Sequence, residues 1–214
     1  MRFDLEAVLF DIDGTLVDST PAVERTWRTW ASRRDVDAAE VLRVCHGRRT
    51  QDTVALFVPP EQRAEAVLEL ERLELEDLDD VVALPAAGSL LARLPADRWA
   101  AVTSGSQRLM RARLAAAGLP VPRVLIAAED VTAGKPDPDG YLKAAAALGV
   151  DPRRCLVVED APVGVRAGKA AGARTLAVTT SHDAAELGEA DAIAPDLASV
   201  TVAPAQGGLV ATVR

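Results

Sequence analysis

Cysteine and aromatic residues are scarce in this 214-residue sequence, and their scarcity excludes several kinds of protein. The two cysteines, Cys45 and Cys155, are too few and too far apart for a disulfide framework or a thiolate metal site. Aromatic residues make up 3% of the chain, so alanine, leucine and valine must supply most of a buried core. These absences indicate a reducing compartment, and we expect a cytoplasmic protein.

Long hydrophobic runs and an excess of positive charge are also missing. No apolar run approaches the roughly 18 residues that a membrane-spanning helix requires, and the first residues lack the basic-then-apolar pattern of an export signal. The formal net charge of −8 opposes binding to nucleic acid or anionic lipid through the overall field. We expect no nucleic-acid or membrane partner, a monomer or weak dimer, and local positive charge around any anionic ligand.

The sequence does contain a series of short apolar runs that alternate with helical patterns. The runs cover residues 7–11, 99–103, 123–127, 155–159, 175–179 and 191–194, and helices are expected over 106–117, 138–148, 163–171 and 183–188. Apolar runs of this length are typical of strands buried on both faces, and alternating strands and helices build a parallel sheet. We predict an α/β fold with a Rossmann-like parallel sheet and helices on both faces.

The alternation stops between the first and second runs, where residues 16–82 have helical patterns throughout. We predict that this segment is an inserted all-helical cap domain, and that residues 1–15 and 83–214 form the Rossmann-like core. Trp27 and Trp30, three positions apart, are expected to pack inside the cap.

The acidic run ELERLELEDLDD, near the end of this insertion, predicts an amphipathic helix. We expect Leu70, Leu73 and Leu78 to face inward and the carboxylates to lie in solvent, without a metal site. At the end of the chain, residues 201–214 are punctuated by glycine and proline and are expected to fray or to add an edge strand.

Acidic residues follow two of the predicted strands. Asp11 and Asp13 come at the end of the first run, and Glu159 and Asp160 close the run at 155–159. Ligands of open α/β sheets collect at the carboxyl ends of the strands, so these side chains are expected to meet there. Carboxylates held close together repel each other unless they share a proton or bind a cation. A hard cation such as Mg²⁺ suits oxygen ligands of this kind.

Two other strand ends supply groups that suit an anion. The run at 99–103 is followed by Ser104, Gly105 and Ser106, whose hydroxyl and amide groups can face an anion at the start of a helix. Lys135, one of only three lysines, stands in a loop between a glycine and a proline. A carboxylate nucleophile, a neighbouring acid or base, a cation, hydroxyls and a lysine are the groups that phosphoryl transfer through an aspartyl-phosphate requires.

These segments carry a resemblance to a known family. In this order and spacing, DIDGT, TSGS, GKPDP and VVEDAPVGVRAG resemble the four signatures of the haloacid dehalogenase superfamily of phosphohydrolases, over about residues 7–198, and the insertion resembles the helical cap of its subclass I. The cap segment CHGRRTQDTVALFVPP (45–60) is similar to that of glycerol-phosphate and 2-deoxyglucose-6-phosphate phosphatases. The resemblance implies Mg²⁺-dependent hydrolysis of a small sugar or polyol phosphate.

The resemblance also implies a role for each matching residue of the core. Asp11 would attack phosphorus, and Asp13 would protonate the leaving alcohol and then deprotonate the attacking water. Ser104 and the amides of Gly105 and Ser106 would bind phosphoryl oxygens, and Lys135 would bridge the nucleophile and the phosphate. Mg²⁺ would be held by Asp11, the Asp13 carbonyl and Asp160, with Glu159 binding directly or through water.

In the cap, the resemblance points to the motif that begins at His46. His46, Arg49 and Thr50 would face the substrate, whereas Arg48 fills the variable position of the motif. Polar side chains here suit a hydroxylated leaving group, because a buried donor left unpaired is costly. Replacing Arg49 is therefore expected to change substrate preference more than chemistry.

Alternative functions are weighed against the same residues. Asp13 argues against a dehalogenase, and a cap without lysine argues against a phosphonate-cleaving enzyme. The closest alternative is a β-phosphoglucomutase-like sugar phosphomutase; those relatives have a histidine ten positions after the acid/base aspartate, where this chain has Val23. A phospho-aspartate signalling or regulatory protein is the non-enzymatic alternative. Signalling receivers lack a helical insertion, and every catalytic position is filled here, so hydrolysis is favoured.

Overall fold

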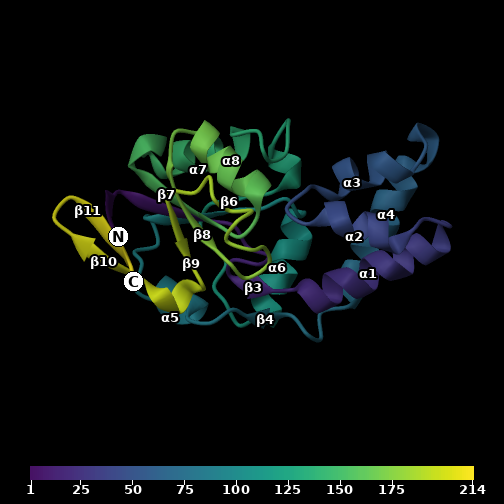
Figure 1. Cartoon of the computed structure of the whole chain (residues 1–214), viewed down its shortest axis with the longest axis horizontal. Coiled ribbons are helices and arrows are strands. Elements are labelled where there is room, and N and C mark those ends of the chain that lie inside the picture. Colours follow the sequence, from purple (N-terminus) through teal and green to yellow (C-terminus); the bar gives the residue numbers. More distant parts are fainter.

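The computed structural model describes residues 1–214, and its centre is a six-stranded sheet (Figure 1). The strands are β2 (Ala7–Phe10), β5 (Trp99–Val102), β6 (Leu125–Ile126), β7 (Cys155–Glu159), β8 (Arg174–Val178) and β9 (Ala192–Ala194), in the spatial order β6-β5-β2-β7-β8-β9. Every pairing is parallel. The predicted α/β class and all six predicted strands are confirmed.

Helices cover both faces of this sheet, and β2 shows how the two faces are divided. Ala7 and Leu9 pack with residues of α7 (Asp139–Leu148) and α8 (Pro162–Ala170). Val8 and Phe10 point to the other face, where α5 (Ala87–Leu91) and α6 (Gln107–Ala116) contribute to the core. Successive side chains of a strand alternate between faces, so a strand covered on both sides is apolar throughout.

The predicted helix over 183–188 is wrong, because these residues form turns. The amides of Glu186 and Leu187 both donate to the Asp183 carbonyl, which makes one isolated turn, and Leu187 is fully buried. One turn is too short to offset the cost of helix nucleation, so burial of this one leucine sets the path of the connection instead.

The two ends of the chain form a second, antiparallel sheet. β10 (Val200–Ala205) and β11 (Gly208–Val213) make a hairpin, and β11 also pairs with β1 (Arg2–Leu5), which the sequence pattern did not reveal. The C-terminal segment therefore adds strands rather than fraying. No helix of the molecule is long and apolar enough to cross a membrane.

Four helices form the insertion that lies to one side of the sheet (Figure 1). They are α1 (Thr20–Arg33), α2 (Ala38–Cys45), α3 (Thr50–Phe57) and α4 (Arg63–Glu76). Two short strands, β3 (Val17–Asp18) and β4 (Val82–Ala83), pair antiparallel where the chain leaves and re-enters the α/β part. The helical insertion is confirmed, with this small hinge ribbon as an addition to the all-helical prediction.

The cap has a hydrophobic core of its own. The rings of Trp27 and Trp30 meet edge to face with their centroids 5.2 Å apart, and both side chains are buried, as predicted. The Trp30 indole N–H donates to the Ala66 carbonyl at 2.9 Å. Leu70 is fully buried in this core and Leu73 packs against it, whereas Leu78 packs against the core of the α/β part.

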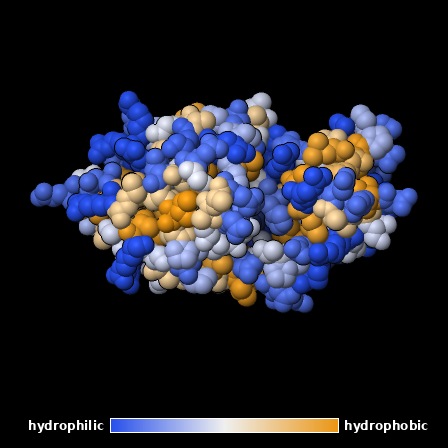
Figure 2. Space-filling view, viewed as in Figure 1, coloured by the Kyte–Doolittle hydropathy of each residue, from blue (hydrophilic) through white to orange (hydrophobic).

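Truncation of Leu70 to alanine is expected to lower the free energy of unfolding by about 2–5 kcal/mol, since transfer energy and packing are both lost. Leu68 provides a matched control, because it lies on the same helix and is 66% exposed. Apolar side chains are visible on the surface of the cap, at the right of the molecule in Figure 2. Leu68→Ala is expected to change stability by less than about 0.5 kcal/mol. Urea denaturation followed by circular dichroism measures both, and equal losses would contradict this packing.

Candidate active site

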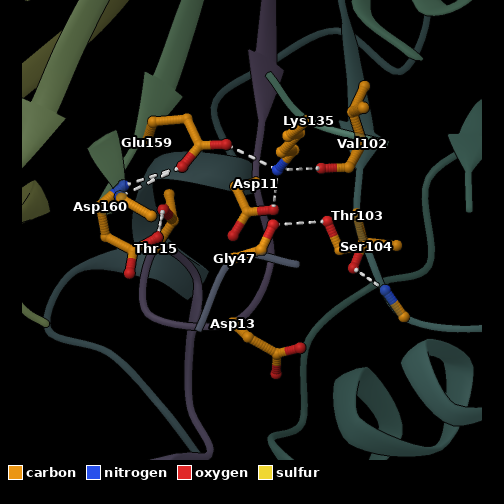
Figure 3. A network of polar contacts seen from close by, with 12 residues as sticks. Asp11, Asp13, Thr15, Gly47, Val102, Thr103, Ser104, Lys135, Glu159 and Asp160 are labelled. Atoms are coloured by element: carbon orange, nitrogen blue, oxygen red, sulfur yellow. Dashed lines mark hydrogen bonds and ion pairs between the residues drawn. The ribbon is translucent and has the colours of Figure 1, made fainter. Parts of the chain in front are cut away.

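The carboxyl ends of β2, β5 and β7 bring the predicted core residues together (Figure 3). Asp11 follows β2, Ser104 follows β5, and Glu159 is the last residue of β7. A cavity of about 80 Å³ opens at this edge between the α/β part and the cap. Its wall includes Asp11, Asp13, Ser104, Gly105 and Asp160 from the core and His46, Arg48 and Thr50 from the cap.

Three carboxylates are clustered at the floor of the site. Asp11, Glu159 and Asp160 are all buried, and each has an oxygen within 4.8 Å of the others. Burial raises the pKa of Asp11 well above its usual value, against the opposing effect of Lys135. Burial, and next the charge of Glu159, raise the pKa of Asp160 to about 7. Burial and mutual repulsion therefore favour a proton or a bound cation on these carboxyl groups.

Lys135 is the cation that reaches this cluster from the protein. Its Nζ donates to Asp11 Oδ1 at 2.5 Å, to Glu159 Oε1 at 2.6 Å and to the Val102 carbonyl at 3.3 Å (Figure 3). Burial favours the neutral amine, but Asp11 and Glu159 outweigh it and hold the pKa of Lys135 above its usual value. Lys135 is therefore charged and fixed beside Asp11.

The residues present fit a divalent metal ion. One ammonium faces three carboxylates, and oxygen is the donor that hard cations prefer. The Oδ2 of Asp11 has no protein donor, whereas Glu159 already accepts from Lys135, from the Tyr141 hydroxyl at 2.7 Å and from two backbone amides. Asp11 is therefore better placed than Glu159 to offer an oxygen to an ion, and Asp160 is the third carboxylate of the cluster.

Two glycines are needed because the carboxylates leave no room for a side chain. Gly14 has φ of +81°, and a Cβ there would lie 2.1 Å from Asp160 Oδ2. A Cβ on Gly164, in α8, would lie 1.8 Å from Glu159 Oε1. The glycine that follows DID is thus required both by its backbone conformation and by the neighbouring acid.

Hydroxyl groups from two loops hold Asp160 in place. Thr15, fully buried, donates its hydroxyl to Asp160 Oδ1 at 3.2 Å, and the Ser181 hydroxyl donates to Oδ2. The sequence analysis did not single out these residues, nor Tyr141. A signal was available for Ser181, because it comes just after the strand β8, at the same edge of the sheet as the other site residues.

The serines after β5 have different environments. Ser104 donates its hydroxyl to the Gly47 carbonyl of the cap at 2.8 Å, so it reaches into the cavity from the core (Figure 3). The Gly105 amide donates a hydrogen bond to Thr103 Oγ1 at 3.1 Å. Ser106 is the N-cap of α6, accepting from the Leu109 amide.

Asp13 points away from Lys135 in Figure 3 and is held by two other residues. Its Oδ1 accepts from the Ser19 hydroxyl at 2.7 Å, and its Oδ2 accepts from Arg113 at 2.8 Å. Asp13 and Asp11 both line the cavity, but their carboxylates have different partners: Ser19 and Arg113 hold Asp13, and Lys135 holds Asp11. Neither Ser19 nor Arg113 was predicted as a site residue.

Arg113 also corrects the prediction for the acidic run of the cap. Glu74, expected in solvent, is only 6% exposed and accepts from Arg113 Nη2 at 3.0 Å. The partner of Glu74 lies on α6, 39 positions away, and the periodicity of the acidic run contains no information about such a distant contact. Burial raises the pKa of Glu74, while the charge of Arg113 opposes this shift.

The residues of the cap motif that reach the cavity differ from those predicted. His46 and Thr50 line the cavity as expected, and burial lowers the pKa of His46, which favours the neutral ring. Arg49 does not line it: its guanidinium pairs with Asp52 and donates to carbonyls of the loop at 131–132. Arg48, assigned to the variable position of the motif, lies at the cavity instead. At the turn before α3, neighbouring side chains leave in different directions, so spacing alone could not choose between them.

The chain is similar in sequence and in fold to known proteins. The family model of haloacid dehalogenase-like hydrolases matches residues 5–172. Hexitol phosphatase A from Escherichia coli (strain K12) is 44% identical over 94% of this chain and 95% of that protein. 2-Deoxyglucose-6-phosphate phosphatase 2 from Saccharomyces cerevisiae is 36% identical over 94% and 92%, respectively. A crystal structure of β-phosphoglucomutase from Clostridium difficile is 21% identical with a TM-score of 0.78 over 90% and 91%, a likeness of fold.

Proposed function

Since the chain belongs to the haloacid dehalogenase-like hydrolases, we propose that it is a phosphatase that hydrolyses small sugar or polyol phosphates through an aspartyl-phosphate on Asp11. The observation that carries this proposal is the contact of Lys135 with one oxygen of Asp11 at 2.5 Å, which leaves the other oxygen without a protein donor at the cavity. A carboxylate with one free oxygen, which Lys135 and a bound cation would hold in its ionised form, is suited to attack phosphorus.

The proposed reaction has two steps that share one acid/base. Asp11 forms a bond to phosphorus while the bond from phosphorus to the leaving oxygen breaks, and Asp13 gives that oxygen its proton. Asp13 then accepts a proton from water, which attacks phosphorus and releases inorganic phosphate and free Asp11. Ser104 and the backbone after β5 would hold phosphoryl oxygens. Asp11, Asp160 and the Asp13 carbonyl would hold Mg²⁺, with Glu159 binding directly or through water, and the ion would supply positive charge that offsets charge on the phosphoryl group.

The cap supports a small, hydroxylated substrate. The cavity is about 80 Å³ and is roofed by the cap, so a phosphoprotein surface could not enter it in this conformation. His46, Arg48 and Thr50 offer polar groups to the leaving alcohol. The curated relatives reported above are named for hexitol and deoxyhexose phosphates, which have this chemistry.

A position in α1 favours hydrolysis over a phosphomutase reaction. Val23, where the mutase-like sequences have a histidine, lines the cavity. The side chain at this point of the wall is therefore apolar and can neither donate nor accept a proton. Nothing at this position would help to return the phosphoryl group to a sugar hydroxyl in place of water.

Binding of Mg²⁺ is expected to stabilise the protein against heat. At a Mg²⁺ concentration about 100 times Kd the gain is about 2.7 kcal/mol, which shifts the Tm of a chain of this size by about 5–10 °C. Differential scanning fluorimetry with Mg²⁺ or with EDTA measures the shift. Asp160→Asn is expected to abolish it, and Asp4→Asn, an exposed aspartate on β1, to leave it intact. No difference between the Mg²⁺ and EDTA samples would contradict the proposed ion site.

The proposed function is tested by phosphate release from a panel of phosphate monoesters, with Mg²⁺ or with EDTA. The panel contains glycerol phosphate, hexose 6-phosphates, 2-deoxyglucose 6-phosphate, hexitol phosphates, a nucleotide and β-glucose 1-phosphate. Strong Mg²⁺-dependent release from sugar or polyol phosphates supports the proposal and identifies the preferred substrate. Isomerised sugar phosphate without free phosphate would overturn it in favour of the mutase.

A further inference from the structure

Arg113 of α6 connects the proposed acid/base to the cap. Nη1 donates to Asp13 Oδ2 at 2.8 Å, and Nη2 donates to Glu74 Oε1 on α4 at 3.0 Å. The Arg113 side chain is only 4% exposed, less than the side chains of Lys135 and Asp11. One guanidinium thus joins a carboxylate of the catalytic loop to a carboxylate of the cap.

The surroundings of Arg113 differ from those of an ordinary structural ion pair. Its Nε is buried and has no hydrogen-bond partner, although buried donors are nearly always paired in folded proteins. Both carboxylates that it contacts line the same cavity as Arg113 itself. A rigid planar fork, rather than a flexible ammonium, is needed to bind two carboxylates in fixed directions. The buried guanidinium and both of its carboxylate partners therefore lie at the wall of the reaction cavity.

Asp13 is fixed only because two residues hold its two oxygens. Ser19 contacts Oδ1 and Arg113 contacts Oδ2, which together determine the orientation of the carboxyl group. A general acid must lie within hydrogen-bond reach of the leaving oxygen, and small misplacements are costly in rate. Ser19 alone would leave the carboxyl free to rotate about its one contact.

We propose that Arg113 is a positioning residue for Asp13, and that Glu74 completes this arrangement when the cap is closed over the substrate. This inference rests on the proposed function, since it needs Asp13 as the acid. Glu74 belongs to α4, so cap opening would remove one of the two partners that orient Arg113. The acid is then held most firmly when a substrate is enclosed.

The inference is tested by comparing two leaving groups in Arg113→Met and Arg113→Lys. For this two-step reaction, kcat/KM reports formation of the aspartyl-phosphate, in which an alcohol must receive a proton and p-nitrophenolate need not. We expect kcat/KM for the best alkyl phosphate of the panel to fall about 100-fold in Arg113→Met, while the value for p-nitrophenyl phosphate falls by less than about fivefold. Arg113→Lys is expected to show the same discrimination, because an ammonium lacks the planar fork.

Controls separate this role from a merely structural one. Arg111→Met changes an exposed arginine on the same helix and is expected to alter neither value. Glu74→Gln, combined with Arg113→Met, removes the carboxylate that would otherwise be left buried and unpaired, so the double variant keeps the test valid if Arg113→Met is unstable. Equal losses for both leaving groups in these variants would overturn the inference.

Asp13→Asn distinguishes failure of the inference from failure of the proposed function. If this variant discriminates strongly between the leaving groups and the Arg113 variants do not, only the role of Arg113 is wrong. If Asp13→Asn itself shows no discrimination, the proposed role of Asp13 as the acid fails, and the inference fails with it.

Discussion

Replacement of Asp11 by asparagine is expected to reduce phosphate release by on the order of 10⁴-fold or more, since loss of a nucleophile removes most of the catalysis. The amide has nearly the shape of the carboxylate but cannot form an acyl-phosphate. Steady-state phosphate release at saturating substrate and Mg²⁺ measures the loss. Activity within tenfold of the unmodified protein would show that Asp11 is not the nucleophile.

The folded state should survive this change, which makes the result interpretable. Asp11→Asn removes one charge from a buried cluster with three carboxylates and one ammonium, while Lys135 keeps its contact with Glu159. We therefore expect no loss of thermal stability in EDTA. Asp4→Asn, on the surface of β1, is the matched control and should change neither activity nor stability.

Replacement of Lys135 by methionine is expected to affect both stability and activity. It leaves Asp11 and Glu159 buried without their cation, and breaking a buried ion pair in this way costs about 3–5 kcal/mol. Loss of a charged donor beside the phosphoryl group is expected to lower kcat by about 10²–10³-fold. Urea denaturation in EDTA and steady-state kinetics in Mg²⁺ measure the two effects.

Mg²⁺ provides a further check on the Lys135 variant. With the ammonium gone, the cluster has more uncompensated negative charge, so the increase in Tm on adding Mg²⁺ should be larger than in the unmodified protein. Lys143→Met, which removes an exposed lysine of α7, should behave as the unmodified protein does. A smaller Mg²⁺ effect in Lys135→Met than in this control would contradict the charge balance described for the site.

Much of the fold was predictable because its information is local. Buried strands such as β2 and β7 are short uninterrupted apolar runs, and the cap helices carry their own periodicity. The sequence pattern failed to predict an element where contacts with a distant part of the chain determine its structure. β1 forms strand pairs because β11 is beside it, and residues 183–188 follow the burial of Leu187 rather than a helical repeat.

The site divides in the same way. Asp11, Ser104, Lys135 and Asp160 are placed by strand ends and motifs, and the structure brings them together at the carboxyl edge of the sheet. Arg113 and Glu74 become meaningful only when α4 and α6 face each other, and neither has a sequence neighbour that reveals the other. The same holds for Arg48 and Arg49, which are adjacent in the sequence: Arg48 lines the cavity, whereas Arg49 contacts the loop at 131–132.

The central place of β2 has a consequence for the biosynthesis of the protein. Its neighbours in the sheet are β5 and β7, with Val8 opposite Trp99 and Leu156. β2 therefore has no neighbour in the sheet until the cap and then β5 (Trp99–Val102) have been translated, and its second neighbour β7 (Cys155–Glu159) comes later still, so the sheet can close only late. The cap helices contact one another within a single continuous segment, so a nascent chain can bury Trp30 and Leu70 while β2 is still exposed.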